Sequence, residues 1–224
     1  MTRRICESLW QVGGVGMSDS SDCLVYLLDL GDLVLVDCGA GPSWPQIQLE
    51  IRSLGRDPGA IHTLLLTHAH LDHIGAAARI RAETGCRVVS HELDAEPIET
   101  GDPERTAASM YGMSLDPCTV DHVMTGADET LPFRDGELRL VHTPGHTPGS
   151  LVAVTELNGQ RVLFGQDLHG PFHPAFESDK TQWRRSMQRV LALEADILCE
   201  GHYGIYRPAA AVRKFIEDLL TANP

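Results

Sequence analysis

Four side chains that can bind a metal occur within six residues, directly after an apolar run at residues 64–66. They are His68, His70, Asp72 and His73. Residues 68, 70 and 72 alternate, so in an extended loop their side chains leave on one side, whereas His73 points in another direction. A single zinc is satisfied by about three protein ligands plus water. With further ligand-type residues downstream, this cluster predicts a centre with two metal ions rather than a polar loop of ordinary histidines.

The length and charge of the chain narrow the classes of function. Its 224 residues suit one domain with a substantial core. The net charge of -13 disfavours a broad surface for nucleic acid or an acidic membrane, and it favours a small-molecule substrate. No apolar run reaches the roughly 18 residues of a membrane helix, and the start of the chain lacks the apolar core of a signal peptide. We therefore expect a cytoplasmic protein without a membrane segment, and the sequence leaves its oligomeric state open.

Six cysteines are scattered along the chain without a Cys-x-x-Cys pair, and the chain is too long to need a disulfide framework. We expect reduced thiols that are mostly buried. Cys38 and Cys199 lie close in sequence to site residues, yet neither has a dedicated histidine base. We therefore interpret both thiols as structural rather than catalytic.

Strand-like runs and helical periodicities alternate along the chain. Predicted strands cover residues 23–30, 33–37, 63–67, 87–90, 137–142, 150–157, 161–164 and 197–199, and a further strand-like segment begins near Thr130. Predicted helices cover residues 45–54, 74–84, 103–111, 179–193 and 208–220. Gly31-Asp32 and Asn158-Gly159 are typical of tight hairpin turns between neighbouring strands.

The order of these elements predicts where the ligand-type residues meet. Four apolar runs lead to metal-binding side chains, which are His68, His146, Asp167 and His202. Loops that leave strands of one sheet gather at its edge, where functional residues are commonly placed. We therefore expect an α/β fold with two sheets packed face to face and helices outside. Residues 92–129 show no comparable pattern and are expected to form a helical insertion in a single domain over residues 1–224.

The chain resembles the metallo-β-lactamase superfamily through motifs that occur in order along most of its length. These motifs are Thr67-His-Ala-His-Leu-Asp-His73, Pro144-Gly-His-Thr-Pro-Gly149, Gly165-Gln-Asp167 and Gly201-His202. The resemblance implies a four-layer αβ/βα sandwich of two mixed β-sheets. It also implies two ligand sets joined by a shared carboxylate: His68, His70 and His146 for one ion, Asp72, His73 and His202 for the other, and Asp167 as the bridge. Asp37 matches an aspartate that the superfamily places after an early strand, where it either orients the histidine loop or serves as a turn residue.

Metal-dependent hydrolysis is the reaction that this ligand set favours. Metal coordination lowers the pKa of bound water to about 7 and so supplies hydroxide at neutral pH. Two ions about 3.5 to 4 Å apart also polarise a carbonyl group and stabilise the oxyanion that develops on it. Asp72 is the candidate catalytic residue, because it can orient the water and accept its proton. We expect two transition-metal ions, with zinc as the first choice and iron or manganese as alternatives.

The expected substrate is a small thioester, ester or lactone. Asp167 at the bridging position differs from true β-lactamases, so the chain is more similar to the glyoxalase II-like branch. Homoserine-lactone lactonases carry a tyrosine shortly after the bridging aspartate, whereas this chain has Leu168-His-Gly170 there. This difference argues against that specific activity. The alternatives are a mononuclear iron oxygenase that resembles persulfide dioxygenases, and a nuclease acting on a phosphodiester. Candidates for an apolar pocket wall are Met110, Tyr111, Phe172 and Phe176.

Overall fold

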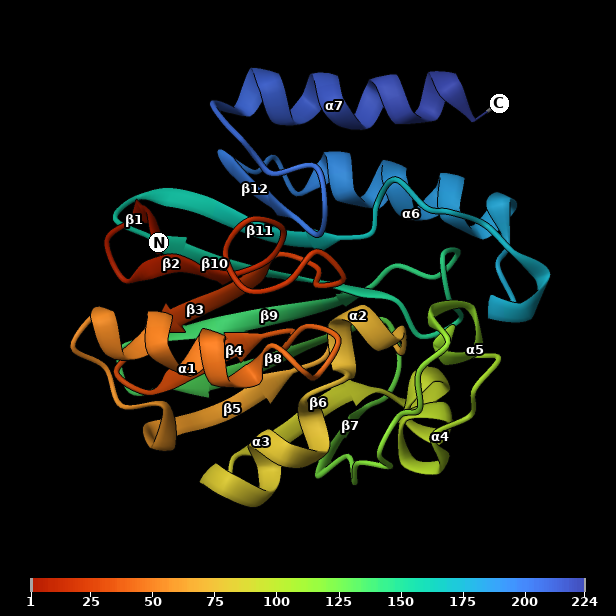
Figure 1. The fold of residues 1–224 in the computed structure, drawn as a ribbon. Helices are drawn as coiled ribbons and strands as arrows, with labels where there is room; N and C mark the ends of the chain where they lie inside the picture. The colour runs from red at the N-terminus through yellow and green to blue at the C-terminus, as the bar shows by residue number, and fades with distance from the viewer. Residues whose placement is uncertain (1, 224) are drawn as a thin grey trace.

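Two mixed β-sheets pack face to face in the computed structural model, which describes residues 2–223 (Figure 1). The first sheet follows the chain order: β1 (Arg3–Cys6), β2 (Leu9–Gly13), β3 (Val25–Asp29), β4 (Leu33–Val36), β5 (Ile61–Leu65), β6 (Arg87–His91) and β7 (His122–Met124). Strands β1 to β4 pair antiparallel, and β4 to β7 pair parallel. Strand β4 is buried along its whole length, as its continuous apolar sequence predicts.

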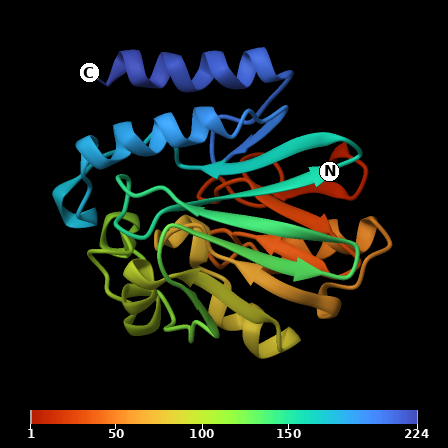
Figure 2. The same cartoon turned by 180° about the vertical axis from the view of Figure 1, so that it is seen from behind.

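The second sheet is built from the second half of the chain. Its strands are β13 (Ile205–Tyr206), β12 (Ile197–Glu200), β11 (Gln160–Gln166), β10 (Leu151–Leu157), β9 (Gly136–His142) and β8 (Asp128–Phe133), in that spatial order. All neighbours pair antiparallel except β11 and β12. Seen from behind, β8, β9 and β10 lie in front of the first sheet (Figure 2).

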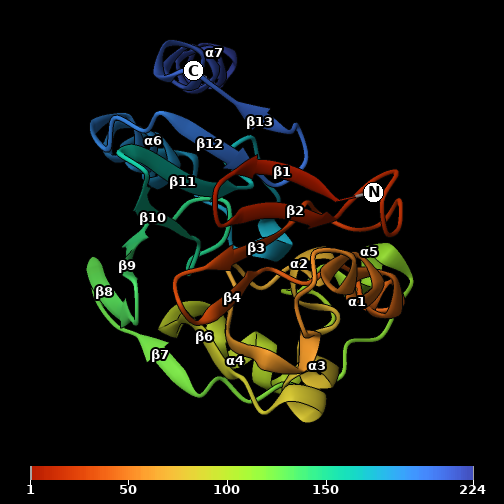
Figure 3. The same ribbon diagram turned by 90° about the vertical axis from the view of Figure 1, so that its left-hand side faces the viewer.

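Helices cover the outer faces of both sheets (Figure 3). They include α1 (Trp44–Ser53) and α3 (Ala77–Thr84) on the first sheet, and α6 (Lys180–Ala192) and α7 (Ala209–Ala222) on the second. Three apolar cores separate the four layers: Trp44 lies in the first, Tyr26 and Phe164 in the middle one, and Trp183 in the third. The predicted four-layer sandwich is therefore confirmed. Within residues 2–223, no helix has the length and apolar character needed to cross a bilayer.

Both predicted hairpins are confirmed. Strands β3 and β4 pair antiparallel around Gly31, and β10 pairs antiparallel with β11. Asn158 and Gly159 have φ values of 51° and 74°, the left-handed conformation that a type I′ turn requires at both central positions. The turn brings the end of β10 directly into β11, which leads to Asp167.

Residues 92–129 differ in detail from the prediction. Helix α4 (Glu92–Thr100) begins directly after β6, whereas α5 (Ala108–Tyr111) covers only the end of the helix predicted over 103–111. Helix α4 was not predicted from the sequence because Pro97 lies inside it, and proline normally interrupts a helix. The carbonyl of Leu93, which Pro97 cannot bond, accepts instead from the guanidinium of Arg105 at 3.1 Å.

Strand β7 also lies in this segment and extends the first sheet beside β6. The sequence reasoning missed it, together with the short strands β1, β2 and β13. The assignment of residues 1–224 to a single domain stays a prediction, and its two terminal residues lie outside those described.

Candidate metal centre

The seven predicted ligands come together from loops that follow four strands. His68 and His70 follow β5, and the short helix α2 (Leu71–Ile74) carries Asp72 and His73. The remaining three follow β9, β11 and β12, respectively: His146, Asp167 and His202. The loops that follow these apolar strands thus bring the polar side chains together in one region, as the order of the elements in the sequence predicted.

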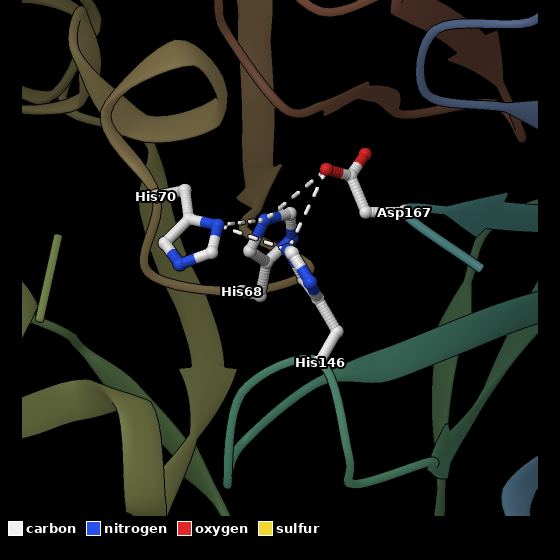
Figure 4. Close-up of side chains that lie close together, drawn as sticks. All are labelled: His68, His70, His146 and Asp167. Atoms are coloured by element: carbon white, nitrogen blue, oxygen red, sulfur yellow. Dashed lines mark hydrogen bonds and ion pairs between the residues drawn. The ribbon is translucent and has the colours of Figure 1, made fainter. Parts of the chain in front are cut away.

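The first ligand set consists of His68, His70 and His146 (Figure 4). Nδ1 of His70 lies 3.1 Å from Nε2 of His68 and 2.9 Å from Nε2 of His146. Oδ2 of Asp167 approaches the same point, 3.5 Å from Nε2 of His146 and 3.9 Å from Nε2 of His68. Three imidazole nitrogens and one carboxylate oxygen, all buried, therefore face one another, and this donor set suits zinc.

The second ligand set consists of Asp72, His73 and His202. Oδ2 of Asp72 lies 3.4 Å from Nε2 of His73 and 3.2 Å from Nε2 of His202. Oδ1 of Asp167 lies 3.2 Å from each of the same two nitrogens. The side chain of His202 is 30% exposed, whereas those of Asp72 and His73 are 5% and 0% exposed. One ligand of this set therefore meets solvent.

Asp167 offers one carboxylate oxygen to each set, since Oδ2 faces the first and Oδ1 the second. Oδ1 of Asp167 and Nε2 of His73 are buried and make no hydrogen bond, although they lie only 3.2 Å apart. Buried polar atoms without partners are costly. A metal cation between these two atoms would satisfy both, so the residues fit a metal.

The charges of the centre fit a metal as well. Burial and the neighbouring imidazoles lower the pKa of His68 and of His70, which keeps both rings neutral, as metal ligands must be. Burial alone would also lower the pKa of His202, but Asp167 and Asp72 outweigh it and raise that pKa to about 10. Negative charge that holds a proton on His202 attracts a divalent cation in the same way.

Asp37 orients the second set. Its Oδ2 lies 2.7 Å from Nδ1 of His73, which donates to it and leaves Nε2 free for a metal. The backbone N–H and the hydroxyl of Thr67 donate to Asp37 at 2.9 and 2.8 Å, and the amide of Gln166 donates to Oδ2. These bonds hold Asp37 at a φ of 57°, a conformation that costs energy for a non-glycine residue. Of the two interpretations of Asp37, the contacts support the orienting one.

Glu200 holds the loop of His202, and the sequence reasoning missed it. Oε2 of this fully buried carboxylate accepts from the backbone N–H groups of His202 and Tyr203 at 2.7 and 2.8 Å. Oε1 lies 2.6 Å from Nδ1 of His169. The available signal was its position directly before Gly201-His202, at the end of an apolar strand. A second buried carboxylate outside the motifs, Asp94, contacts the loops of the first set.

A pocket of about 560 Å³ opens onto the metal centre. Both ligand sets reach it, through His70 of the first and through Asp72 and His202 of the second, and the shared Asp167 also lines it. Three of the four predicted wall residues also line it, namely Met110, Tyr111 and Phe176. Tyr203, which was not predicted, lines it as well. The fourth, Phe172, does not, because its ring packs against Trp183 with the centroids 5.2 Å apart.

All six cysteines are free thiols, and five of them are buried. Sγ of Cys38 donates to the backbone carbonyl of His73 at 3.1 Å. Burial raises the pKa of Cys38 and of Cys199, so both are held as neutral thiols. Cys23 lies beside Asp37 and His73, and these three buried residues form a third group whose side chains are of metal-binding types.

The family model for the metallo-beta-lactamase superfamily matches residues 19–202. Hydroxyacylglutathione hydrolase GloC of Haemophilus influenzae is 34% identical over 160 residues, which is 65% of this chain and 70% of that protein. A hydroxyacylglutathione hydrolase of Shewanella baltica is 27% identical over 183 residues, but this alignment covers only 57% of its length and 80% of this chain.

A solved structure, the metallo-beta-lactamase of Cronobacter sakazakii, superposes with a TM-score of 0.83. The match covers 99% of this chain and 95% of that one at 22% identity, so it shows a shared fold.

Proposed function

The chain belongs to the metallo-β-lactamase superfamily, and on that premise we propose that it is a dinuclear, metal-dependent hydrolase of a small thioester, ester or lactone. The observation that carries the proposal is the position of Asp167, whose two oxygens face two separate ligand sets. One oxygen per set is the arrangement of a bridging carboxylate. Zinc is the proposed metal, because imidazole and carboxylate ligands suit it, and iron and manganese are the alternatives.

In this proposal the first set and Oδ2 of Asp167 would hold one ion, and the second set and Oδ1 would hold the other. When bound, two such ions supply a hydroxide nucleophile at neutral pH and polarise the carbonyl group of the substrate. We assign to Asp72 the orientation of a water and the acceptance of its proton, and the assignment is supported by its position beside His202 in the pocket lining. Asp37 keeps His73 in the tautomer that presents Nε2.

The pocket supports an uncharged acyl substrate. Its lining includes Met110, Tyr111, Phe176 and Tyr203 but no lysine or arginine, so it offers apolar contact and no cation to clamp a phosphate or carboxylate. Lys180 does not line the pocket, and its ammonium group lies 5.3 Å from the ring centroid of Phe172. The two hydroxyacylglutathione hydrolases among the relatives favour a thioester as the first substrate to test.

Steady-state turnover on matched thioester, ester, lactone, phosphodiester and β-lactam substrates tests this proposal. We expect the thioester or ester to be cleaved fastest, with activity lost after metal removal and restored by zinc. A preference for the phosphodiester would identify a nuclease instead. Activity that requires one iron and oxygen would identify an oxygenase.

A further inference from the structure

Asp94 contacts both loops that carry the first ligand set, although it lies outside every ligand motif. It lies in the first turn of α4, and the residue is only 1% exposed. Its Oδ2 accepts from the backbone N–H of Ala69 at 2.9 Å and from the hydroxyl of Thr147 at 2.7 Å. Its Oδ1 accepts from the backbone N–H of Gly149 at 2.7 Å. One carboxylate thus receives three hydrogen bonds from two loops.

The loop after β9 is shaped to admit this carboxylate. A Cβ atom at position 149 would lie 2.5 Å from Oδ1 of Asp94, which is closer than real Cβ contacts come, so glycine is required there. Thr147 is held in place by Ser150, whose hydroxyl lies 2.7 Å from the Thr147 hydroxyl and accepts from its backbone N–H at 3.0 Å. The loop therefore leaves space for the Asp94 carboxylate at Gly149 and holds the Thr147 hydroxyl in position to bond it.

We propose that Asp94 is the positioning residue of the first metal ion. Ala69 lies between His68 and His70, and Thr147 directly follows His146. Asp94 therefore fixes the spacing of all three ligands through adjoining residues of their two loops. The two loops leave strands of different sheets, β5 and β9, so a link between them joins the two halves of the sandwich.

A backbone hydrogen bond, from the N–H of Leu151 to the carbonyl of Thr67 at 2.9 Å, adds to the link that Asp94 makes between the two loops.

The inference rests on the proposed metal-binding function, because it assigns Asp94 a role toward a metal. Outer residues that orient metal ligands typically contribute about 10- to 100-fold to metal affinity or activity.

An amide cannot replace the Asp94 carboxylate. Both oxygens face backbone N–H groups, which only donate. In Asp94→Asn the new NH₂ group must therefore face either Ala69 or Gly149, and that backbone donor loses its acceptor. The substitution preserves the size of the side chain and removes one specific bond.

Glu200→Gln is the matched control. It makes the same chemical change at another fully buried carboxylate, in the loop of the second set. Here Oε2 keeps both of its backbone donors, while the new NH₂ group faces the imidazole of His169, which accepts a hydrogen bond in its other tautomer. The control therefore perturbs a buried carboxylate without disturbing the first set.

The test is the rate at which a chelator removes Co²⁺ from the full-length protein loaded with two ions. In Asp94→Asn we expect one ion to leave about 10- to 100-fold faster than in wild type. The other ion should leave within about twofold of its wild-type rate. Paramagnetically shifted imidazole signals identify the ion that leaves, because the first set has three histidines and the second has two.

Thr147→Val is a milder variant that keeps both backbone bonds of Asp94. It should accelerate the release of the same ion by a smaller factor, and it keeps the test available if Asp94→Asn folds poorly.

Amide hydrogen exchange of the metal-free protein provides the second readout. At least one of the amides of Ala69 and Gly149 should exchange about tenfold faster in Asp94→Asn, since one of them loses its acceptor. Both amides should exchange at the wild-type rate in Glu200→Gln. Wild-type release rates in Asp94→Asn, or equal acceleration of both ions, would overturn the inference while leaving the proposed function intact. A wild-type protein that takes up no metal would reject the proposed function and, with it, the metal-positioning role, even if the exchange rates change.

Discussion

The two ligand sets are held in different surroundings. The histidines of the first set are at most 4% exposed, and Asp94 joins their loops across the two sheets. The second set is oriented by Asp37 and Glu200, and its His202 side chain is 30% exposed at the pocket. We infer that the first set holds an ion firmly, whereas the second presents its ion to the substrate. The difference is one of degree, since His70 of the first set also lines the pocket, beside Asp72 and His202 of the second.

Substitution of the shared carboxylate should have the largest effect, because it removes what the two sets have in common. Asp167→Asn replaces one oxygen by an NH₂ group, which cannot bind a metal. We expect both ions to be weakened and hydrolysis to fall by more than about 100-fold, beyond the range typical of outer residues. Metal analysis after dialysis, together with turnover measurements, checks this. Full retention of both ions would show that Asp167 does not bridge.

Alanine substitutions in the separate sets should then distinguish them. His202→Ala should reduce occupancy of the second ion and leave the first in place, because their imidazole ligands do not overlap. His146→Ala should do the reverse and release the more enclosed ion. Titration of each metal-free variant with zinc in a calorimeter measures the remaining sites. Loss of both ions in His202→Ala would contradict the independence of the sets.

Removal of the metal should destabilise the whole protein, since the ligand loops join both sheets. Ligand at about 1,000 times its dissociation constant stabilises a folded state by about 4 kcal/mol. For a protein of this size that corresponds to a fall in Tm of about 10 °C when the metal is stripped. Thermal unfolding monitored by circular dichroism, with and without chelator, measures the shift. An unchanged Tm would mean that neither set contributes to stability.

A pocket substitution should sharpen the contrast between the open and the closed set. Met110 is 54% exposed and lines the pocket beside the second set. Met110→Ala should raise KM several-fold with little change in kcat, because each buried CH₂ contributes about 0.8 kcal/mol to binding. Kinetics on the preferred ester and unchanged metal content test this. A fall in kcat with KM unchanged would place Met110 in the chemical step.

The smallest effect should come from the buried thiols. Cys38→Ser retains a donor toward the carbonyl of His73, and Cys199→Ser places a hydroxyl within an apolar strand at a cost of about 1–3 kcal/mol in stability. Both variants should keep turnover within about twofold, because neither thiol acts as a nucleophile. Mass spectrometry during turnover serves as the check, and an acyl group trapped on either cysteine would contradict it.

The layered fold and the meeting of the ligands could be predicted because they depend on local patterns. Continuous apolar runs marked the central strands, and the turn at Asn158-Gly159 defined a hairpin. The residues that fasten the loops could not be predicted in the same way. Asp94 resembles any acidic residue near the start of a helix, and its role arises only from contacts with Ala69 and Gly149, 25 and 55 positions away. Phe172 was placed wrongly in the pocket for the same reason, since its packing on Trp183 is a tertiary contact.

The central claim is that two separate ligand sets share Asp167, and anomalous X-ray diffraction from crystals of the purified protein tests it most directly. Data collected at the zinc and iron edges identify each metal and locate it. We predict two zinc peaks about 3.5 to 4 Å apart, one beside the three histidines of the first set and the other beside Asp72, His73 and His202. A single iron peak at full occupancy would contradict the account.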